Sequence, residues 1–290
     1  MDAVVAHWTI QPTVTLGAAI ACLLYWRGVR YSRRRGIGRR DPAWTGAAFV
    51  AGLVTVFVAL CSPLDYWSDR YLWAHMAQHE LLILVAAPLL LLGAPVWRLW
   101  RGVPLSWRRV SLRWLIKQWG IRRWWGLLVH ALTRPVVAWT LFTGMFTVWH
   151  LPALYDFALT HEPAHVAEHM MFLATALLFW SQVIPTRPAH AVMSHPKQMV
   201  YLSLAAIHSN VLGSVFMFST GALYPYYAAL PRTPSNLPLL QDQHFAAAAM
   251  DVPATIIFFL AIVALLGFWL QAEENLPEPL AARHAFSPHR

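Results

Sequence analysis

Two pairs of histidines stand four residues apart in this sequence, His75 with His79 and His165 with His169. Residues at this spacing share one face of an α-helix, so two imidazoles on consecutive turns can hold one ion. Glu168 adds a carboxylate directly before His169. Because neutral imidazole is a common ligand of copper, zinc, iron and nickel, the two pairs predict a metal or cofactor site.

The elements that carry these histidines are predicted to be membrane-spanning helices. The chain has 290 residues, of which 58% are hydrophobic and only 12% charged, whereas a soluble domain carries about 25% charged residues. Several apolar blocks reach the roughly 20 residues that a helix needs to cross a bilayer. We therefore predict an all-α, polytopic membrane bundle in one domain, residues 1–272, with a tail at 273–290. Its seven predicted spans lie near 10–27, 44–62, 73–93, 135–152, 163–184, 197–219 and 244–270.

The basic residues predict how this bundle is oriented. Most of the 22 lysines and arginines fall in the connections after the first, third and fifth predicted spans. Basic connections stay in the cytoplasm, which predicts an N-terminus outside and a C-terminus inside a bacterial inner membrane. The connection 94–134 interleaves arginine with tryptophan and is predicted to lie on the inner face as an amphipathic segment. The net charge of +9 thus indicates membrane lipid, and not nucleic acid, as a partner.

In this orientation, the polar residues within the spans gather in the outer half of the membrane. Ionisable groups inside a span are costly and usually face the bundle interior with a partner. Besides the two histidine pairs and Glu168, the residues at this depth are His150, His208, His244, Glu80 and Asp251.

The methionines bear on which metal this site would bind. Thioether sulfur favours Cu(I), and imidazole suits copper and zinc alike. We rank copper first, zinc second and haem third, because haem needs only one histidine from each of two helices. Six of the nine methionines fall in the outer halves of the predicted spans: Met76, Met145, Met170, Met171, Met217 and Met250.

A zinc-protease pattern, H-E-x-x-H, occurs from His161 to His165. That chemistry needs both histidines and the glutamate on one continuous helix. Proline suits the first turn of a helix, so Pro163 predicts that His161 and Glu162 precede the helix. We therefore prefer His165 with His169 as the metal-binding pair.

Several motifs resemble those of a single family when they are taken together. They are His75-Met76-Ala77-Gln78-His79, the run 87–95, Trp149-His150-Leu151-Pro152, Leu154-Tyr155-Asp156, Glu168-His169-Met170, Phe179-Trp180, Leu223-Tyr224-Pro225 and Asp242-Gln243. The chain thereby resembles the CtaG family, the seven-helix cytochrome c oxidase assembly factors linked to caa-type oxidases.

This resemblance implies a role in maturing a haem-copper oxidase, with the oxidase subunits as partners and no enzymatic activity of its own. It also adds Asp242, which precedes the last span, to the residues near the site. Three residues depart from the family pattern: Glu80, His244 and Asp251. These departures leave the ligand set and the client oxidase open.

Three hypotheses follow. The first is an assembly factor that binds Cu(I) through the two histidine pairs, with His150, Met76 and Met170 in support. The second is a membrane zinc hydrolase in which Glu168 or Asp251 activates water. The third is a haem protein that transfers electrons.

Overall fold

The computed structural model describes residues 8–36, 42–93, 95–117, 119–184, 193–231 and 237–275. Throughout these ranges the regular structure is helical, and they contain no strand. The predicted all-α bundle is therefore confirmed. Most of the predicted tail at 273–290 lies outside the described residues, as does Ala94.

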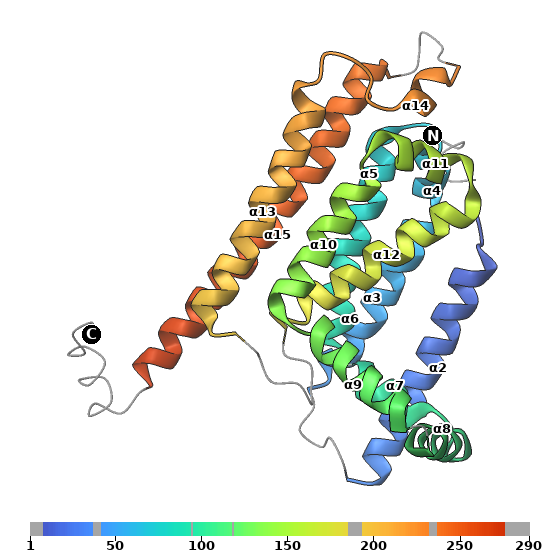
Figure 1. The fold of residues 1–290 in the computed structure, drawn as a ribbon, viewed down its shortest axis with the longest axis vertical. Helices are drawn as coiled ribbons and strands as arrows, with labels where there is room; N and C mark the ends of the chain where they lie inside the picture. Colours follow the sequence, from blue (N-terminus) through green and yellow to red (C-terminus); the bar gives the residue numbers. More distant parts are fainter. Residues whose placement is uncertain are drawn as a thin grey trace.

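Long apolar helices form the body of the molecule (Figure 1). Five segments are long and apolar enough to cross a membrane: α2 (Pro12–Arg34), α3 (Trp44–Cys61), the run Leu72–Leu92, α13 (His195–Phe218) and α15 (Leu239–Glu274). A sixth is possible if α10 (Pro135–Trp149) and α11 (Pro152–Thr160) count as one span, although they bend by 74° at their junction. The molecule is therefore a multi-pass membrane protein by the character of its helices.

The helix α12 (Glu162–Trp180) lies within the bundle beside α10 (Figure 1). This helix is less apolar than the five long segments named above. The reason is local, since His165, Glu168 and His169 lower the mean hydropathy of an otherwise apolar helix. The seven crossings and the side on which each terminus lies stay predictions.

Two of the helices are longer than the predicted spans. The helix α2 continues seven residues past the predicted end at 27, and there the Arg30 guanidinium lies over the Trp26 ring, 4.5 Å from its centroid. Gly36, at φ 67°, supplies the left-handed residue that commonly follows a helix end. The helix α15 runs well beyond 244–270 and contains Pro253 in its interior, which membrane helices tolerate.

The predicted third span is not one regular helix. It consists of α5 (Leu72–Glu80), a π-helical segment η1 (Leu81–Ala86) and α6 (Ala87–Leu92). Pro88 has no N–H to donate, so a carbonyl in the preceding turn needs another donor. The Trp180 indole donates to the Ile83 carbonyl at 2.9 Å. Because π-helical turns are frequent at functional sites, a π-helical segment that begins two residues after His79 is consistent with a functional site on α5.

The connection 94–134 forms three helices: α7 (Pro95–Gly102), α8 (Leu105–Lys117) and α9 (Trp119–Leu132). Contact with lipid was predicted for the whole connection, but α7 packs against α2 instead. A side chain on Gly28 would collide with the Arg98 carbonyl, and the Arg98 guanidinium donates to the Tyr25 hydroxyl, to Thr45 Oγ1 at 2.9 Å and to the Gly93 carbonyl at 2.7 Å. Trp107 and Trp114 of α8 and Trp124 and Trp125 of α9, by contrast, are exposed.

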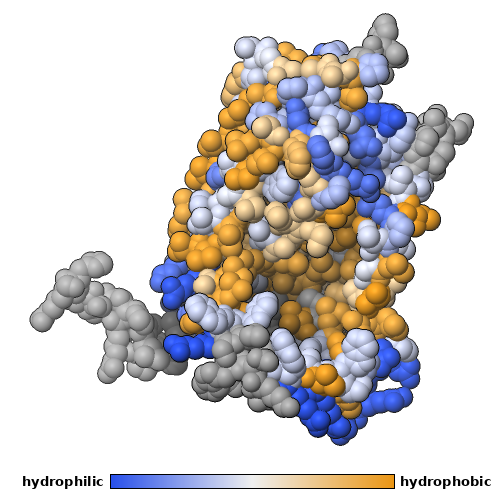
Figure 2. Space-filling model, turned by 45° about the vertical axis from the view of Figure 1, so that its right-hand side comes forward, coloured by the Kyte–Doolittle hydropathy of each residue, from blue (hydrophilic) through white to orange (hydrophobic). Residues whose placement is uncertain are grey.

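The helix ends form two distinct poles (Figure 1). One pole is closed by α4 (Pro63–Ser68), α11 and α14 (Pro225–Ala229), and α5, α12 and α15 begin there. We call this pole the α5 end; α7, α8 and α9 lie at the opposite one. Apolar side chains form a broad band between the poles (Figure 2), as a bilayer requires.

Candidate metal centre

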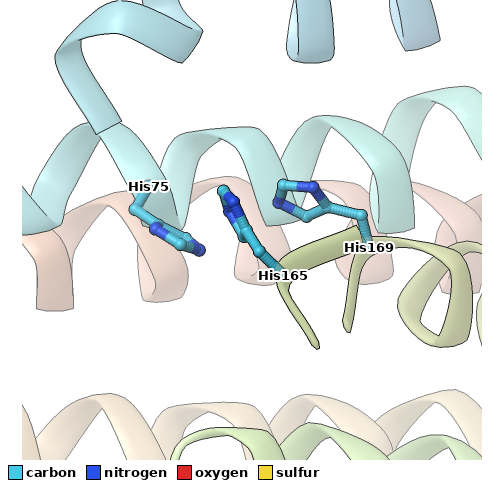
Figure 3. A group of neighbouring side chains, drawn as sticks. All are labelled: His75, His165 and His169. Carbon is cyan, nitrogen blue, oxygen red and sulfur yellow. The ribbon is translucent and has the colours of Figure 1, made fainter. Parts of the chain in front are cut away.

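The two predicted histidine pairs meet inside the bundle near the α5 end. His75 and His79 lie on α5, and His165 and His169 lie on α12. Within each helix the two ring centroids are 4.4 Å apart. Between the helices, His75 lies 5.1 Å from His165, and His79 lies 5.3 Å from His169. In Figure 3 the rings of His165 and His169 rise from α12 towards His75.

Glu168 projects into the same space. Its two carboxylate oxygens lie 3.8 Å from His75 Nε2 and 3.7 Å from His79 Nε2. These distances exceed hydrogen-bond length, so the carboxylate faces the imidazoles without being bonded to them. We call the five residues His75, His79, His165, Glu168 and His169 the histidine cluster.

The histidine cluster is buried, and its polar atoms lack hydrogen-bond partners among the described residues. Glu168 is fully buried, and the three most buried histidines are at most 8% exposed; His165 is half-buried. The unpaired atoms are His75 Nε2, both nitrogens of His79, His165 Nε2, His169 Nε2 and both oxygens of Glu168. Each unpaired buried polar group costs about 1–3 kcal/mol, so a convergence of seven such atoms calls for a specific reason.

The donor atoms are placed as a metal ion would require. One group comprises His75, His165 and His169, and another comprises His75, His79 and Glu168. In each group the three potential ligand atoms lie within 4.8 Å of one another. An ion bound by nitrogen at about 2.0–2.1 Å separates its ligands by at most about 4 Å, so small side-chain rotations would complete either group.

Tyr227 of α14 fixes the orientation of His75. Its hydroxyl donates to the Ser68 carbonyl at 2.7 Å and lies 3.4 Å from His75 Nδ1. With its one proton committed to Ser68, the hydroxyl can only accept from His75, which places the imidazole proton on Nδ1. The lone pair is then on Nε2, the atom that faces Glu168. Hydrogen bonds of this kind orient histidine ligands at metal sites.

His150 and Met76 place two further potential metal-ligand atoms, a nitrogen and a sulfur, beside the histidine cluster. The His150 ring lies 6.1 Å from that of His79. Its Nδ1 lies 2.6 Å from the Phe146 carbonyl, and its Nε2 lies 3.3 Å from the Met76 sulfur. Since the carbonyl can only accept, Nδ1 carries a proton, and in the neutral ring Nε2 presents its lone pair to the thioether. Both side chains are buried.

The other predicted site residues are not brought into the histidine cluster. Met170 is 67% exposed on the outer surface of α12. His208 of α13 is bonded to Thr147 at 3.0 Å. Asp242 caps α5 by accepting from the backbone amides of Leu72 and Trp73, each at 3.1 Å.

His244 and Asp251 lie half-buried on α15. The Asp251 carboxylate packs over Gly213 of α13. Glu80 is buried on another side of α5, where it lines a cavity of about 10 Å³ together with His208 and Ser209. None of the three departures from the family pattern belongs to either group of potential ligand atoms found among the described residues.

The H-E-x-x-H pattern does not form a protease site. The helix α12 begins one residue earlier than predicted, at Glu162, and His161 is its N-cap. The predicted separation of the two histidines nevertheless occurs, because the exposed His161 ring stacks on Phe157 of α11 with centroids 4.2 Å apart.

Comparison with known proteins assigns the family. A family model described as cytochrome c oxidase caa3 assembly factor (Caa3_CtaG) matches residues 23–272. The chain belongs to this family. Membership in the Caa3_CtaG family confirms the resemblance that the motifs indicate, and the matched range contains the whole histidine cluster. No curated protein and no solved structure matches the chain.

Some residues that shape the site of this Caa3_CtaG protein were missed in the sequence. Tyr227 and Ser68 are the clearest cases, since Tyr227 lies far from His75 in the chain and Ser68 contributes only its backbone carbonyl. The stretch Tyr224-Pro225-Tyr226-Tyr227 offers one signal, because buried tyrosines need partners for their hydroxyls. Tyr224 follows the same rule and donates to the His150 carbonyl at 2.9 Å.

Proposed function

We propose that this Caa3_CtaG protein binds copper as Cu(I) at the histidine cluster and supplies it to a caa3-type cytochrome c oxidase during assembly. One observation carries the proposal: unpaired imidazole nitrogens from α5 and α12 converge in a buried space. Neutral imidazoles are good ligands for copper, and the family description names the oxidase. The copper is cargo in this scheme, and no substrate bond is broken.

The metal-ligand atoms in and around the histidine cluster suit a soft ion that is bound and later released to the oxidase. Cu(I) accepts imidazole and thioether ligands, and His150 with Met76 lies directly beside His79. The Glu168 carboxylate supplies one negative charge against the single positive charge of Cu(I). Such compensation matters because an uncompensated charge inside a membrane is costly.

The predicted orientation fits this role. With the N-terminus outside, the α5 end faces the outer side of a bacterial inner membrane. Copper for a caa3-type oxidase would then be received and released at that side, by exchange of one ligand for another without a change in oxidation state.

The proposal is tested by the copper content of the oxidase itself. In cells that make both proteins, His79→Ala together with His169→Ala should lower the copper content and activity of the purified oxidase. His208→Ala is the matched control, because it removes a span histidine that lies outside the histidine cluster. Normal oxidase copper in the double variant would refute the delivery role.

Zinc is a second candidate, and the position of Glu168 favours it. A carboxylate 3.7–3.8 Å from two imidazoles is a suitable ligand for Zn²⁺ or a base for a zinc-bound water. A zinc hydrolase would bind Zn²⁺ in preference to Cu(I) at this site. It would also cleave a lipid or amide substrate. Loading the purified protein with each metal in turn separates the two candidates.

A further inference from the structure

The histidine cluster and its neighbours contain more ligand atoms than one ion binds. Four imidazoles and the Glu168 carboxylate converge in it, and His150 Nε2 and the Met76 sulfur lie beside them. A zinc ion in a protein takes about four ligands, and a copper ion on imidazole and sulfur takes about three or four. Whichever ligands a single ion took, several buried imidazole or carboxylate atoms would stay unpaired.

His75 can serve only one ion. Its Nδ1 carries the proton, so only Nε2 has a lone pair to offer, yet both groups of ligand atoms described above include this residue. An ion on His75, His165 and His169 would occupy the first group (Figure 3). His79 and Glu168 would then remain unpaired, because His79 Nε2 and the carboxylate, 3.7 Å apart, are beyond hydrogen-bond length.

The atoms left over by such an ion lie next to a thioether. Met76 precedes His79 by three residues on α5, so the two side chains share one face of that helix. The Met76 sulfur lies 3.3 Å from His150 Nε2, and the His150 ring lies 6.1 Å from that of His79. Met76, His79 and Glu168 are each at most 1% exposed. They form a second, more deeply buried set of ligands, and its sulfur favours Cu(I).

The carboxylates near the cluster match two monovalent cations. Glu168 faces His79 in the more deeply buried set. The negative charge of Asp65, on α4, acts on both His75 and His165 of the other set. Each Cu(I) would thus have one carboxylate to compensate its charge, as an ion buried in a membrane requires.

We infer that the site holds two Cu(I) ions at once, which we call the rim ion and the deep ion. The inference rests on the proposed function for the identity of the ion, and it adds the number of ions and their positions. Since one rim ligand, His165, is half-buried, the rim ion is the one that can exchange with a donor outside the bundle. The ligands are His75, His165 and His169 for the rim ion, and His79, Glu168 and Met76 for the deep ion, with His150 beside it.

The copper content of the saturated protein tests the number of ions. Purified protein is loaded anaerobically with excess Cu(I), and weakly held copper is removed with a competing chelator. We expect two copper ions per chain, and the same in His208→Ala, which removes a histidine outside the site. One ion per chain would overturn the inference while leaving the proposed function intact, and no bound copper would overturn both.

X-ray absorption at the copper edge tests the two ligand sets. His165→Ala should lose only the rim ion and His79→Ala only the deep ion, so each variant keeps one copper. The copper left in His165→Ala should have a sulfur ligand from Met76, and the copper left in His79→Ala should have none. Loss of both ions from either variant, or the same ligands in both, would overturn the inference. The unaltered protein decides if a variant does not fold, because sulfur should bind half of its copper and an absence of sulfur would overturn the deep position.

A pair of aspartate substitutions tests how the charges are divided. In His79→Ala, which keeps the rim ion, Asp65→Asn should weaken Cu(I) binding about tenfold, an effect typical of lost groups around a metal site. In His165→Ala, which keeps the deep ion, Asp65→Asn should change nothing. Asp69→Asn, an exposed substitution at the same end of the molecule, is the matched control in both backgrounds. An equal effect of Asp65→Asn on both ions, or none on either, would overturn the inference.

Discussion

Glu168 is the residue that most constrains the chemistry of the site. A carboxylate buried among four imidazoles is stable only with a compensating positive charge, whether a proton or a metal ion. Bound Cu(I) would leave the Glu168 carboxylate and the ion with no net charge together. Glu168 is thus as much a part of the proposed site as the histidines, which their four-residue spacing predicts.

Replacing Glu168 by its neutral isostere should weaken copper binding. Glu168→Gln keeps the shape but removes the charge, and we expect the affinity for Cu(I) to fall about 10- to 100-fold, the effect typical of lost groups around a metal site. The measurement is an anaerobic competition titration of the purified protein. Glu162→Gln, at the exposed start of α12, should change nothing. Unchanged or tighter binding by Glu168→Gln would contradict the charge argument.

The two methionines proposed as supporting ligands should behave differently. Met76 is fully buried against His150, whereas Met170 is 67% exposed. Met76→Leu removes a thioether at nearly constant volume and should lower Cu(I) affinity about three- to tenfold, with a smaller effect on Zn²⁺. Met170→Leu should leave both affinities unchanged. Equal effects of the two substitutions would exclude a role for the Met76 sulfur.

The separation of these methionines shows what the sequence could predict. The histidine pairs were predictable because a spacing of four gives a shared helical face. Met170 directly follows His169, and consecutive helical residues point about 100° apart, so it faces outward from α12. Met76 directly follows His75 yet is buried, because α5 is enclosed on more than one side. Only the packing of the helices distinguishes these two cases.

Among the elements, α2 is distinguished by having buried residues in its second half only. Gly28 lets the α2 backbone reach the Arg98 carbonyl of α7, while Gly17 meets nothing. Gly28→Ala should therefore destabilise the protein by about 1–3 kcal/mol through overpacking. Gly17→Ala should be neutral or slightly stabilising, because alanine favours the helix. Thermal unfolding in detergent compares the two, and equal stability of both variants would contradict the close contact of α2 with α7.

The elements also show where local patterns fail. Prolines occupy the first position of α2, α4, α10, α11 and α14, where proline is commonly found. The π-helical segment after Glu80 has only an indirect signal in Pro88, because the donor that replaces the missing N–H is Trp180 of another helix. The position of Tyr227 against His75 likewise arises from contact between residues far apart in the chain. The local patterns thus predict the helices well and the detailed packing poorly.

At the scale of the whole molecule, the basic residues and the histidine cluster occupy opposite poles. The arginine-rich helices α7, α8 and α9 lie away from the α5 end (Figure 1). If those helices are cytoplasmic, as the charge bias predicts, the C-terminus lies in the cytoplasm. A fluorescent protein fused after Arg290 should then fluoresce, and a periplasmic phosphatase fused there should be inactive. The reverse pattern would place the histidine cluster on the inner side and contradict outer-side delivery.

The most direct test of the account is whether the histidine cluster binds Cu(I). The purified protein would be titrated anaerobically in detergent against a competing chelator, beside the His79→Ala, His169→Ala double variant. A double variant with His208→Ala and His244→Ala provides the control, since both of those histidines lie outside the cluster. We predict tight binding by the parent and the control, and its loss in the cluster variant. Absent binding, or binding that survives loss of His79 and His169, would contradict the central claim.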